Sequence, residues 1–211
     1  MKQSLNEIIM LASQAPRHEP FIPLPDGTLI LVRRPTDTEI DNIHGLTRAE
    51  LEVSTVPLHV IKAVHKHNKD TLWGVYHASE DSLEARRDAR MVGYYGFLHL
   101  TQAGRNQVER AEFDAGDPPL ELIVPHGERP AAIYIWAVVA KGVARYGTPL
   151  TARGLGRDLY GGVPIYTTAG TMGGLSSIKG YGFAAARPAQ EGLGHLFRLD
   201  PPQIAAKTAA A

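Results

Sequence analysis

The segment that decides the fold runs from residue 133 to residue 149 and reads IYIWAVVAKGVARYGTP. Its first part, from Ile133 to Val139, is continuously apolar and rich in β-branched and aromatic residues, which is typical of a strand buried on both faces. A glycine-containing loop follows, and Thr148 is placed as the N-cap of a helix that we expect from Pro149 to Tyr160. The segment therefore predicts a strand, a loop and a helix in direct succession.

The start of that helix is a candidate anion site. A helix N-terminus offers unpaired amides and the positive end of a dipole, and both favour a phosphate group. Gly147 would let the backbone approach such a ligand closely, and the guanidinium of Arg145 would pair with a phosphate oxygen. The loop from Ala144 to Pro149, with Tyr146 and Thr148 inside it, is therefore a candidate phosphate cradle.

Apolar runs on both sides of this segment extend the prediction to a larger sheet. Downstream, we expect a strand, a helix and two closing strands, at Val163–Thr168, Met172–Tyr181, Phe183–Ala186 and Leu193–Leu199. Upstream, we expect strands at Leu29–Arg33, Thr71–His77, Met91–Leu100 and Leu120–Val124, and helices at Thr36–Leu46 and Pro57–His67. Thr36 and Glu39 have the spacing of a capping box, which marks a helix start. A sheet with helices on both faces is the natural packing for this order of elements.

Two polar stretches and both ends of the chain interrupt this pattern. Ser79–Arg90 is highly charged and predicts a loop or a short solvated helix, and Arg105–Asp117 predicts a long loop. In residues 1–27 we expect an amphipathic helix at Ser4–Ala15 and then a proline-rich extended connector. Residues 28–200 would form a single domain, and the alanine-rich residues 201–211 a disordered tail.

The composition narrows the function classes. Of the 211 residues, 44% are hydrophobic, enough for a sizeable core, and 22 basic residues balance 22 acidic ones. The lack of a basic excess argues against general nucleic-acid binding. The lack of cysteine excludes disulfides, thiolate metal sites and a cysteine nucleophile. Because no signal-peptide pattern and no apolar run of membrane-spanning length occur, we expect a cytoplasmic protein without membrane insertion.

Two motifs lie at fixed distances from the strand at Ile133–Val139. The loop at residues 144–149 carries an arginine and a glycine shortly after this strand, and Gly182-Phe183 closes the helix that follows the next strand. This arrangement resembles the GNAT superfamily of acyl-CoA N-acyltransferases, which has a pyrophosphate loop of the type Gln/Arg-x-x-Gly-x-Gly/Ala and, later, Tyr-x-x-x-Gly-Phe. The resemblance covers residues 28–199 in element order and residues 133–183 in motif residues.

The resemblance implies a fold and a co-substrate. The fold is α/β of the α+β type: a mixed, mostly antiparallel central sheet, splayed at the cofactor site, with helices on both faces. The co-substrate is acetyl-CoA or another acyl-CoA. The residues implied in binding it are Val138 and Val139 on the central strand, the loop at 144–149, and Thr171 and Gly174 at the start of the later helix.

The implied reaction is direct attack of an amine on the thioester carbonyl, with catalysis by positioning and by a backbone amide near Val138 or Val139. The family's usual catalytic acid is the tyrosine of its later motif, but Ile178 stands at that position, and the nearby hydroxyl candidates are Ser176 and Ser177. For the general base we name His99 and Glu121. The acceptor would be a small-molecule or peptide amine, and a homodimer is an open alternative.

Several readings stay open at this stage. Arg153-Gly154-Leu155-Gly156 competes with residues 144–149 as the pyrophosphate loop, although it would leave only a short helix after it. A GNAT-like domain that has lost catalysis and binds only CoA or a partner is the alternative to an active enzyme, and an unrelated α/β domain is a third reading. The histidines near residue 65 match no familiar ligand spacing, so we expect no metal site there.

Overall fold

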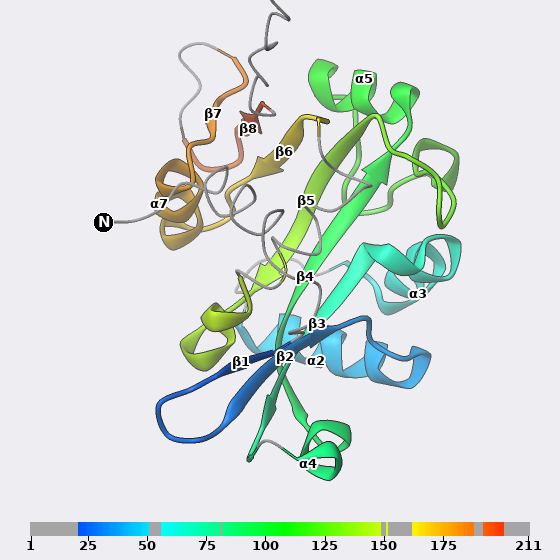
Figure 1. Ribbon diagram of the computed structural model, residues 1–211. Coiled ribbons are helices and arrows are strands. Elements are labelled where there is room, and N and C mark those ends of the chain that lie inside the picture. Colours follow the sequence, from blue (N-terminus) through cyan, green and yellow to red (C-terminus); the bar gives the residue numbers. More distant parts are fainter. Residues whose placement is uncertain are drawn as a thin grey trace, which may run out of the picture.

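A computed structural model describes residues 21–50, 56–80, 82–148, 151, 162–187 and 192–200. These residues build one open sheet with the strand order β1-β2-β3-β4-β5-β6-β8-β7 (Figure 1). Its neighbouring strands are antiparallel except for β5 and β6, which run parallel. The expected fold, a mixed and mostly antiparallel α+β sheet, is confirmed.

The strands are long in the middle of the sheet and short at its edges. Their bounds are β1 Phe21–Pro23, β2 Leu29–Arg33, β3 Leu72–Ala78, β4 Arg90–Leu100, β5 Ala132–Val139, β6 Ile165–Thr168, β7 Ala184–Ala185 and β8 Leu196–Leu199. The α-helices are α2 Ile40–Glu50, α3 Leu58–His67, α4 Leu83–Arg87, α5 Gln102–Arg110 and α7 Met172–Gly180. Short 3₁₀ turns are η1 Asp37–Glu39, η2 Lys69–Thr71, η3 Leu120–Leu122 and η4 Gly142–Gly147.

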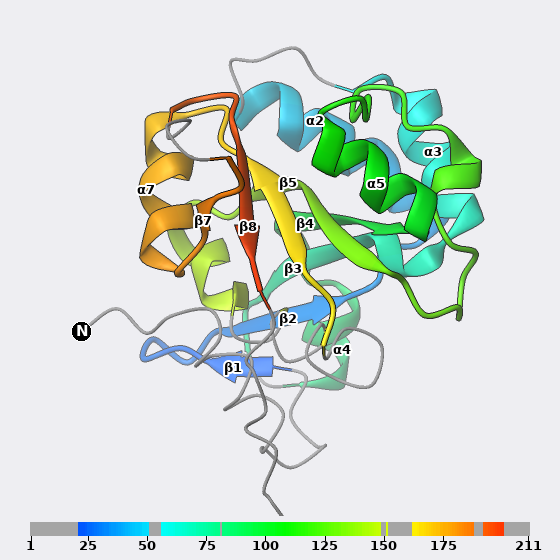
Figure 2. The same cartoon turned by 90° about the horizontal axis from the view of Figure 1, so that it is seen from above.

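The helices divide between the two faces of the sheet (Figure 2). Helices α2, α3 and α5 cover one face, which we call the helical face, through apolar side chains such as Ile43, Val64 and Val108. The other face, which we call the η4 face, carries η4 and α7 through Ala144, Leu175 and Ile178. Both faces of the central strands are therefore buried, as their continuous apolar sequences indicate.

One helix was missed by the sequence analysis. The first part of Arg105–Asp117, which was expected to be a long loop, belongs to α5, whereas the residues after Arg110 lie outside a helix. The hydroxyl of Thr101 caps α5 by accepting from the amide of Gly104 at 3.1 Å. The pattern was misleading because Val108 is the only large apolar residue of this helix that is buried. Gly104 packs directly on the carbonyl oxygen of Leu122, so a glycine here signals close packing and not a loop.

Other expectations need smaller corrections. Phe21–Pro23, expected in a connector, pairs with β2 as an edge strand. The strand expected at Leu120–Val124 is a 3₁₀ turn with a single bridge from Ile123 to Leu100. The predicted helix at Ser4–Ala15, the predicted tail at 201–211 and nearly all of the predicted helix at 149–160 lie outside the described residues.

The close contact between β4 and the end of β5 gives a first prediction. A Cβ added at Gly93 would lie 2.3 Å from the carbonyl oxygen of Val139 and 2.8 Å from the Cβ of Ala144. Neither neighbour is a flexible side-chain end, so Gly93→Ala should lower the free energy of unfolding by about 2 kcal/mol or more. Chemical denaturation followed by circular dichroism measures this change.

Gly45→Ala is the matched control. Gly45 lies inside α2, and a Cβ added there meets nothing within 4 Å. The change should raise the free energy of unfolding by about 0.5–1 kcal/mol, because alanine has the better helix propensity. Equal effects of the two substitutions would contradict the close contact at Gly93.

Candidate functional site

The strands β5 and β6 part in the middle of the sheet. They pair in parallel only through Ile133–Ile165, Tyr134–Tyr166 and Ile135–Thr167, whereas β5 continues to Val139 alongside β4. Among the described residues, no strand pairs with this second half of β5 on the β6 side. Val138 in this stretch is 45% exposed although it belongs to a central strand. The open edge therefore offers backbone polar groups and an apolar side chain to a ligand.

A β-bulge lies at the point of parting. Gly96 pairs with Ala137 and Phe97 pairs with Ile135, which leaves Trp136 as the extra residue of β5. As a result, the consecutive residues Trp136 and Ala137 both pack towards the helical face. The next residue, Val138, pairs with Tyr95 and lies on the η4 face. The bulge thus sets which side chains the open edge presents.

The predicted phosphate cradle takes a different form from the expected one. Residues Gly142–Gly147 are a 3₁₀ turn, and Thr148 follows with helical angles of φ −55° and ψ −47°, so its prediction as a helix N-cap is wrong. The amides of Ala144 and Thr148 donate to Lys141 and Arg145 within the turn. These two amides are already paired, so they do not resemble the row of free donors expected for a phosphate.

Glycine and arginine in this turn have separate roles. A Cβ at Gly147 would lie 2.9 Å from Cγ1 of Val75, so this glycine serves close packing on the sheet. Arg145 is exposed on η4, and its guanidinium donates to the hydroxyl of Tyr146 at 3.1 Å, which raises the pKa of Arg145. An exposed guanidinium of this kind is free to face a phosphate in solution. Pro149 and the competing loop at 153–156 lie outside the described residues.

The start of α7 agrees with the prediction. Thr171 is its N-cap, and its hydroxyl accepts from the amide of Gly174 at 3.0 Å. This helix begins just after β6, so its N-terminus follows directly from the strand that parts from β5 (Figure 1). Ile178, at the position where the GNAT motif has tyrosine, packs against the apolar cluster of the η4 face. The hydroxyl of Ser177 donates to the carbonyl of Gly173 at 3.0 Å on the exposed side of α7.

A pair of hydroxyl groups that the sequence analysis missed lies on the η4 face, and one of them belongs to Tyr95, the β4 partner of Val138. The hydroxyl of Tyr95, on β4, lies 2.6 Å from that of Thr148, and burial raises the pKa of Tyr95 to about 12. Tyr181 packs into the same apolar cluster. The β4–β5 register is what identifies Tyr95, because this register pairs it with Val138.

His99 does not lie near this open edge. It pairs with Ile133, five residues from Val138 along β5, which is roughly 16 Å at about 3.3 Å per residue. The side-chain amide of Asn68 donates to its Nδ1 at 3.0 Å and to the carbonyl of Val124 at 3.0 Å. An amide nitrogen can only donate, so Nδ1 of His99 accepts and the ring is neutral. Burial lowers the pKa of His99 to about 4.

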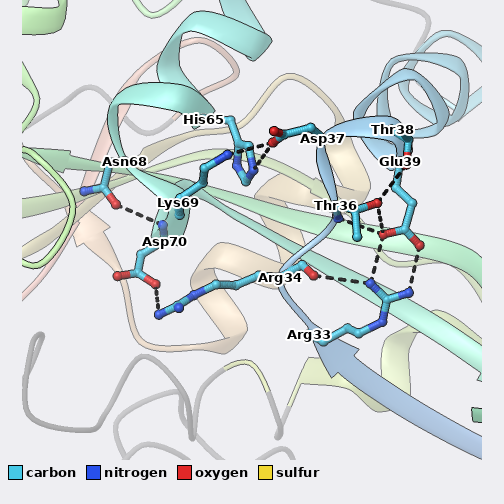
Figure 3. Close-up of polar contacts among 10 residues, drawn as sticks. All are labelled: Arg33, Arg34, Thr36, Asp37, Thr38, Glu39, His65, Asn68, Lys69 and Asp70. Atoms are coloured by element: carbon cyan, nitrogen blue, oxygen red, sulfur yellow. Dashed lines mark hydrogen bonds and ion pairs between the residues drawn. The ribbon is translucent and has the colours of Figure 1, made fainter. Parts of the chain in front are cut away.

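Asn68 belongs to a polar network that joins the end of β2, the turn η1, the end of α3 and the turn η2 (Figure 3). The side-chain oxygen of Asn68 accepts from the backbone amide of Asp70 at 2.9 Å. The buried carboxylate of Asp70 pairs with Arg34 and, at 3.2 Å, with His126. Lys69 pairs with Asp37 at 2.6 Å. The network joins three connections of the fold, so its role here is structural.

The same network contains the predicted capping box. The carboxylate of Glu39 accepts from the amide of Thr36 at 2.8 Å and from both terminal nitrogens of Arg33 at 2.7 and 2.9 Å (Figure 3). The Arg33 guanidinium lowers the pKa of Glu39 to about 2. The remaining predicted base, Glu121, is exposed on η3, the turn that follows α5, and the structure does not bring it to the open edge.

Comparison with known proteins identifies no family. No protein-family model matches the chain, and no curated protein matches it. The sheet, with its single parallel pair between β5 and β6, is compatible in outline with a GNAT-like architecture. Within the described residues, no helix is both long and apolar enough to cross a bilayer.

The burial of His99 predicts a pH dependence of stability. Its pKa is about 4 in the folded protein against 6.5 when exposed, so the unfolded chain binds more protons between these values. Stability is therefore lost as the pH falls from about 6.5 to about 4, by on the order of 3 kcal/mol from this group. His99→Gln, which cannot titrate, should reduce the stability difference between pH 7 and pH 4 by this amount.

Urea unfolding of both proteins at these two pH values measures the difference. The comparison is made within each protein, so any loss of packing in the variant at pH 7 cancels. An unchanged difference would mean that His99 titrates alike in the folded and unfolded chains.

Proposed function

We propose that the protein is an N-acyltransferase that binds an acyl-CoA, with an acetyl group as the first candidate, at the open edge of β5. The observation that carries the proposal is the parting of β5 and β6 beside the bulge at Trp136. It leaves a half-exposed apolar side chain, Val138, next to backbone groups without a strand partner among the described residues. An extended amide-containing chain such as that of CoA pairs well with such an edge.

The chemistry proposed at this edge is a direct transfer. The acceptor's amine nitrogen forms a bond to the thioester carbonyl carbon, the carbon–sulfur bond breaks, and its electron pair leaves with the sulfur. The amine gives up a proton, and the CoA thiolate takes one up. A backbone amide near Val138 or Val139 would stabilise the charge that develops on the carbonyl oxygen.

In this proposal, the diphosphate end of the cofactor lies near η4 and its acyl-pantetheine end lies near the start of α7. Arg145, exposed on η4, is the described residue best suited to face its diphosphate. The competing segments 144–149 and 153–156 both stay in the proposal as the loop that holds the phosphates. The start of α7 at Thr171 and Gly174 would border the acyl-pantetheine chain. We place the reaction in the cytoplasm, with a small-molecule or peptide amine as acceptor.

A domain that binds CoA without transferring an acyl group is the second candidate. It is favoured by Ile178, a partly buried apolar residue that packs against the core at the position where the GNAT motif has the hydroxyl of a tyrosine. Tyr95 supports the active alternative, because its hydroxyl lies on the same face as Val138 and contacts Thr148. A tyrosine hydroxyl is protonated at neutral pH, as a proton donor to a thiolate must be.

Isothermal titration with acetyl-CoA tests the binding site. We expect saturable binding that Val138→Asp weakens at least about tenfold, because a carboxylate would occupy the place proposed for the acyl chain. Val138 is exposed enough that the change should cost less than about 1 kcal/mol of stability. Leu120→Asp is the matched control, since Leu120 is 37% exposed on η3, away from the open edge.

Absence of binding to acetyl-CoA and longer acyl-CoAs would overturn both candidate functions. Equal losses of affinity in the two variants would contradict the location. Release of CoA thiol in the presence of an amine panel separates the candidates: turnover that Tyr95→Phe reduces supports the enzyme, and binding without turnover supports the second candidate.

A further inference from the structure

A second site lies on the helical face, beside the point where β5 and β6 part. It is a cavity of about 360 Å³ between the end of α5, the strands β5 and β6, and the described residues 187 and 194–196, which follow β7 and lead into β8. Figure 2 shows α5 lying across this end of the sheet. Its lining residues are Val108, Ala111, Phe113, Tyr134, Thr168, Arg187, Gly194, His195 and Leu196. This volume falls in the lower range for small-molecule sites.

Two of the residues that line the cavity lie next to the point where β5 and β6 part. Tyr134 and Thr168 come from the two strands that part, and their hydroxyls lie 3.1 Å from each other. Thr168 is the first residue of β6 beyond its last pair with β5, Thr167–Ile135. A molecule in the cavity would therefore lie on one side of the parted strands, and an acyl chain along Val138 on the other.

The walls combine apolar groups with polar ones. Phe113 and Tyr134 contact each other with ring centroids 5.7 Å apart and give one aromatic wall. The guanidinium of Arg187 and the imidazole of His195 are polar groups of the same lining. The guanidinium of Arg187 donates to the backbone carbonyl of Glu109 at 3.1 Å through one nitrogen, and no described carboxylate lies within ion-pair distance of it. Its remaining donors suit a carboxylate, which a guanidinium binds in a fork.

Glu109 is the α5 residue whose backbone carbonyl accepts from Arg187, and its own carboxylate already has partners. Glu109 accepts from the hydroxyl of Tyr166 and, at 3.1 Å, from Nε of Arg105, and Arg198 lies 3.7 Å away. These partners lower its pKa. The described residues that line the cavity include no aspartate or glutamate, and the guanidinium of Arg187 makes their charge complementary to an anion.

From these contacts we infer that the cavity binds a small carboxylate with an aromatic or apolar body, its carboxylate on Arg187 and His195 and its ring against Phe113 and Tyr134. The inference rests on the proposed function only in one respect: an amine on the same molecule, directed towards Thr168, makes it the acyl acceptor. The acceptor is then of the amino-acid class, and the acyl transfer balances as written above.

Ligand-observed NMR on the full chain without acyl-CoA tests the cavity alone. The probes are 3-phenylpropionate and L-phenylalanine, with phenethylamine as the analogue that lacks the carboxylate. We expect both carboxylates to bind and phenethylamine to bind at least about tenfold more weakly, as loss of a charged hydrogen bond predicts. Arg187→Gln should weaken the carboxylates by a similar factor, and Thr168→Val should not.

The matched control is Arg110→Gln. Arg110 lies at the end of α5, pairs with Glu112 and does not line the cavity. Failure of both carboxylates to bind, or equal effects of the two arginine variants, would overturn the inference. This result is independent of acetyl-CoA titration, so loss of one proposal is distinguishable from loss of the other. Carboxylate binding without acylation of L-phenylalanine retains the cavity and removes the acceptor role.

Discussion

Among the described residues, the second half of β5 pairs with a strand on one side only, and the candidate site depends on this constraint. β4 pairs with β5 as far as Val139, whereas β6 leaves after Ile135. An unpaired strand edge inside a sheet is costly unless something covers or solvates it. The close approach of Gly93 to Val139 and Ala144 lets η4 fold back over β4 and anchor the strand there. The edge stays in place because β4 and η4 fix it.

The bulge at Trp136 gives the two faces of this edge different properties. On the helical face, the Trp136 indole donates to the carbonyl of Ala115 at 2.7 Å, and so ties the segment after α5 to the strand. On the η4 face, Val138 is half-exposed and pairs with Tyr95. Two ligands can then approach one short stretch of backbone from opposite faces. The proposed direct transfer would require the reacting atoms of the two bound substrates to meet beside this stretch, because its catalysis would consist mainly of positioning.

Much of the sheet could be predicted from the sequence because each central strand carries its own signal. The run from Ile133 to Val139 is apolar over its whole length, and the run that ends at Leu100 is apolar or aromatic except for its glycines and His99, which is what burial on both faces requires. Helix α5 gave no such signal, because it buries only Val108 among its large side chains and depends on a cap at Thr101 and on Gly104 packing against Leu122. A helix held by its end and by one glycine contact has no apolar stripe to detect.

The site was harder to predict than the fold, because side-chain chemistry does not reveal cross-strand position. His99 has suitable chemistry for a base, but the register places it opposite Ile133, where Asn68 fixes it as a neutral acceptor. Tyr95, four residues earlier on the same strand, lies opposite Val138. The extra residue at Trp136 shifts this register by one, and a one-residue shift reverses the face of every later side chain. Which residues of β4 face the open edge of β5 is therefore decided by the bulge, and only the pairing of the two strands reveals it.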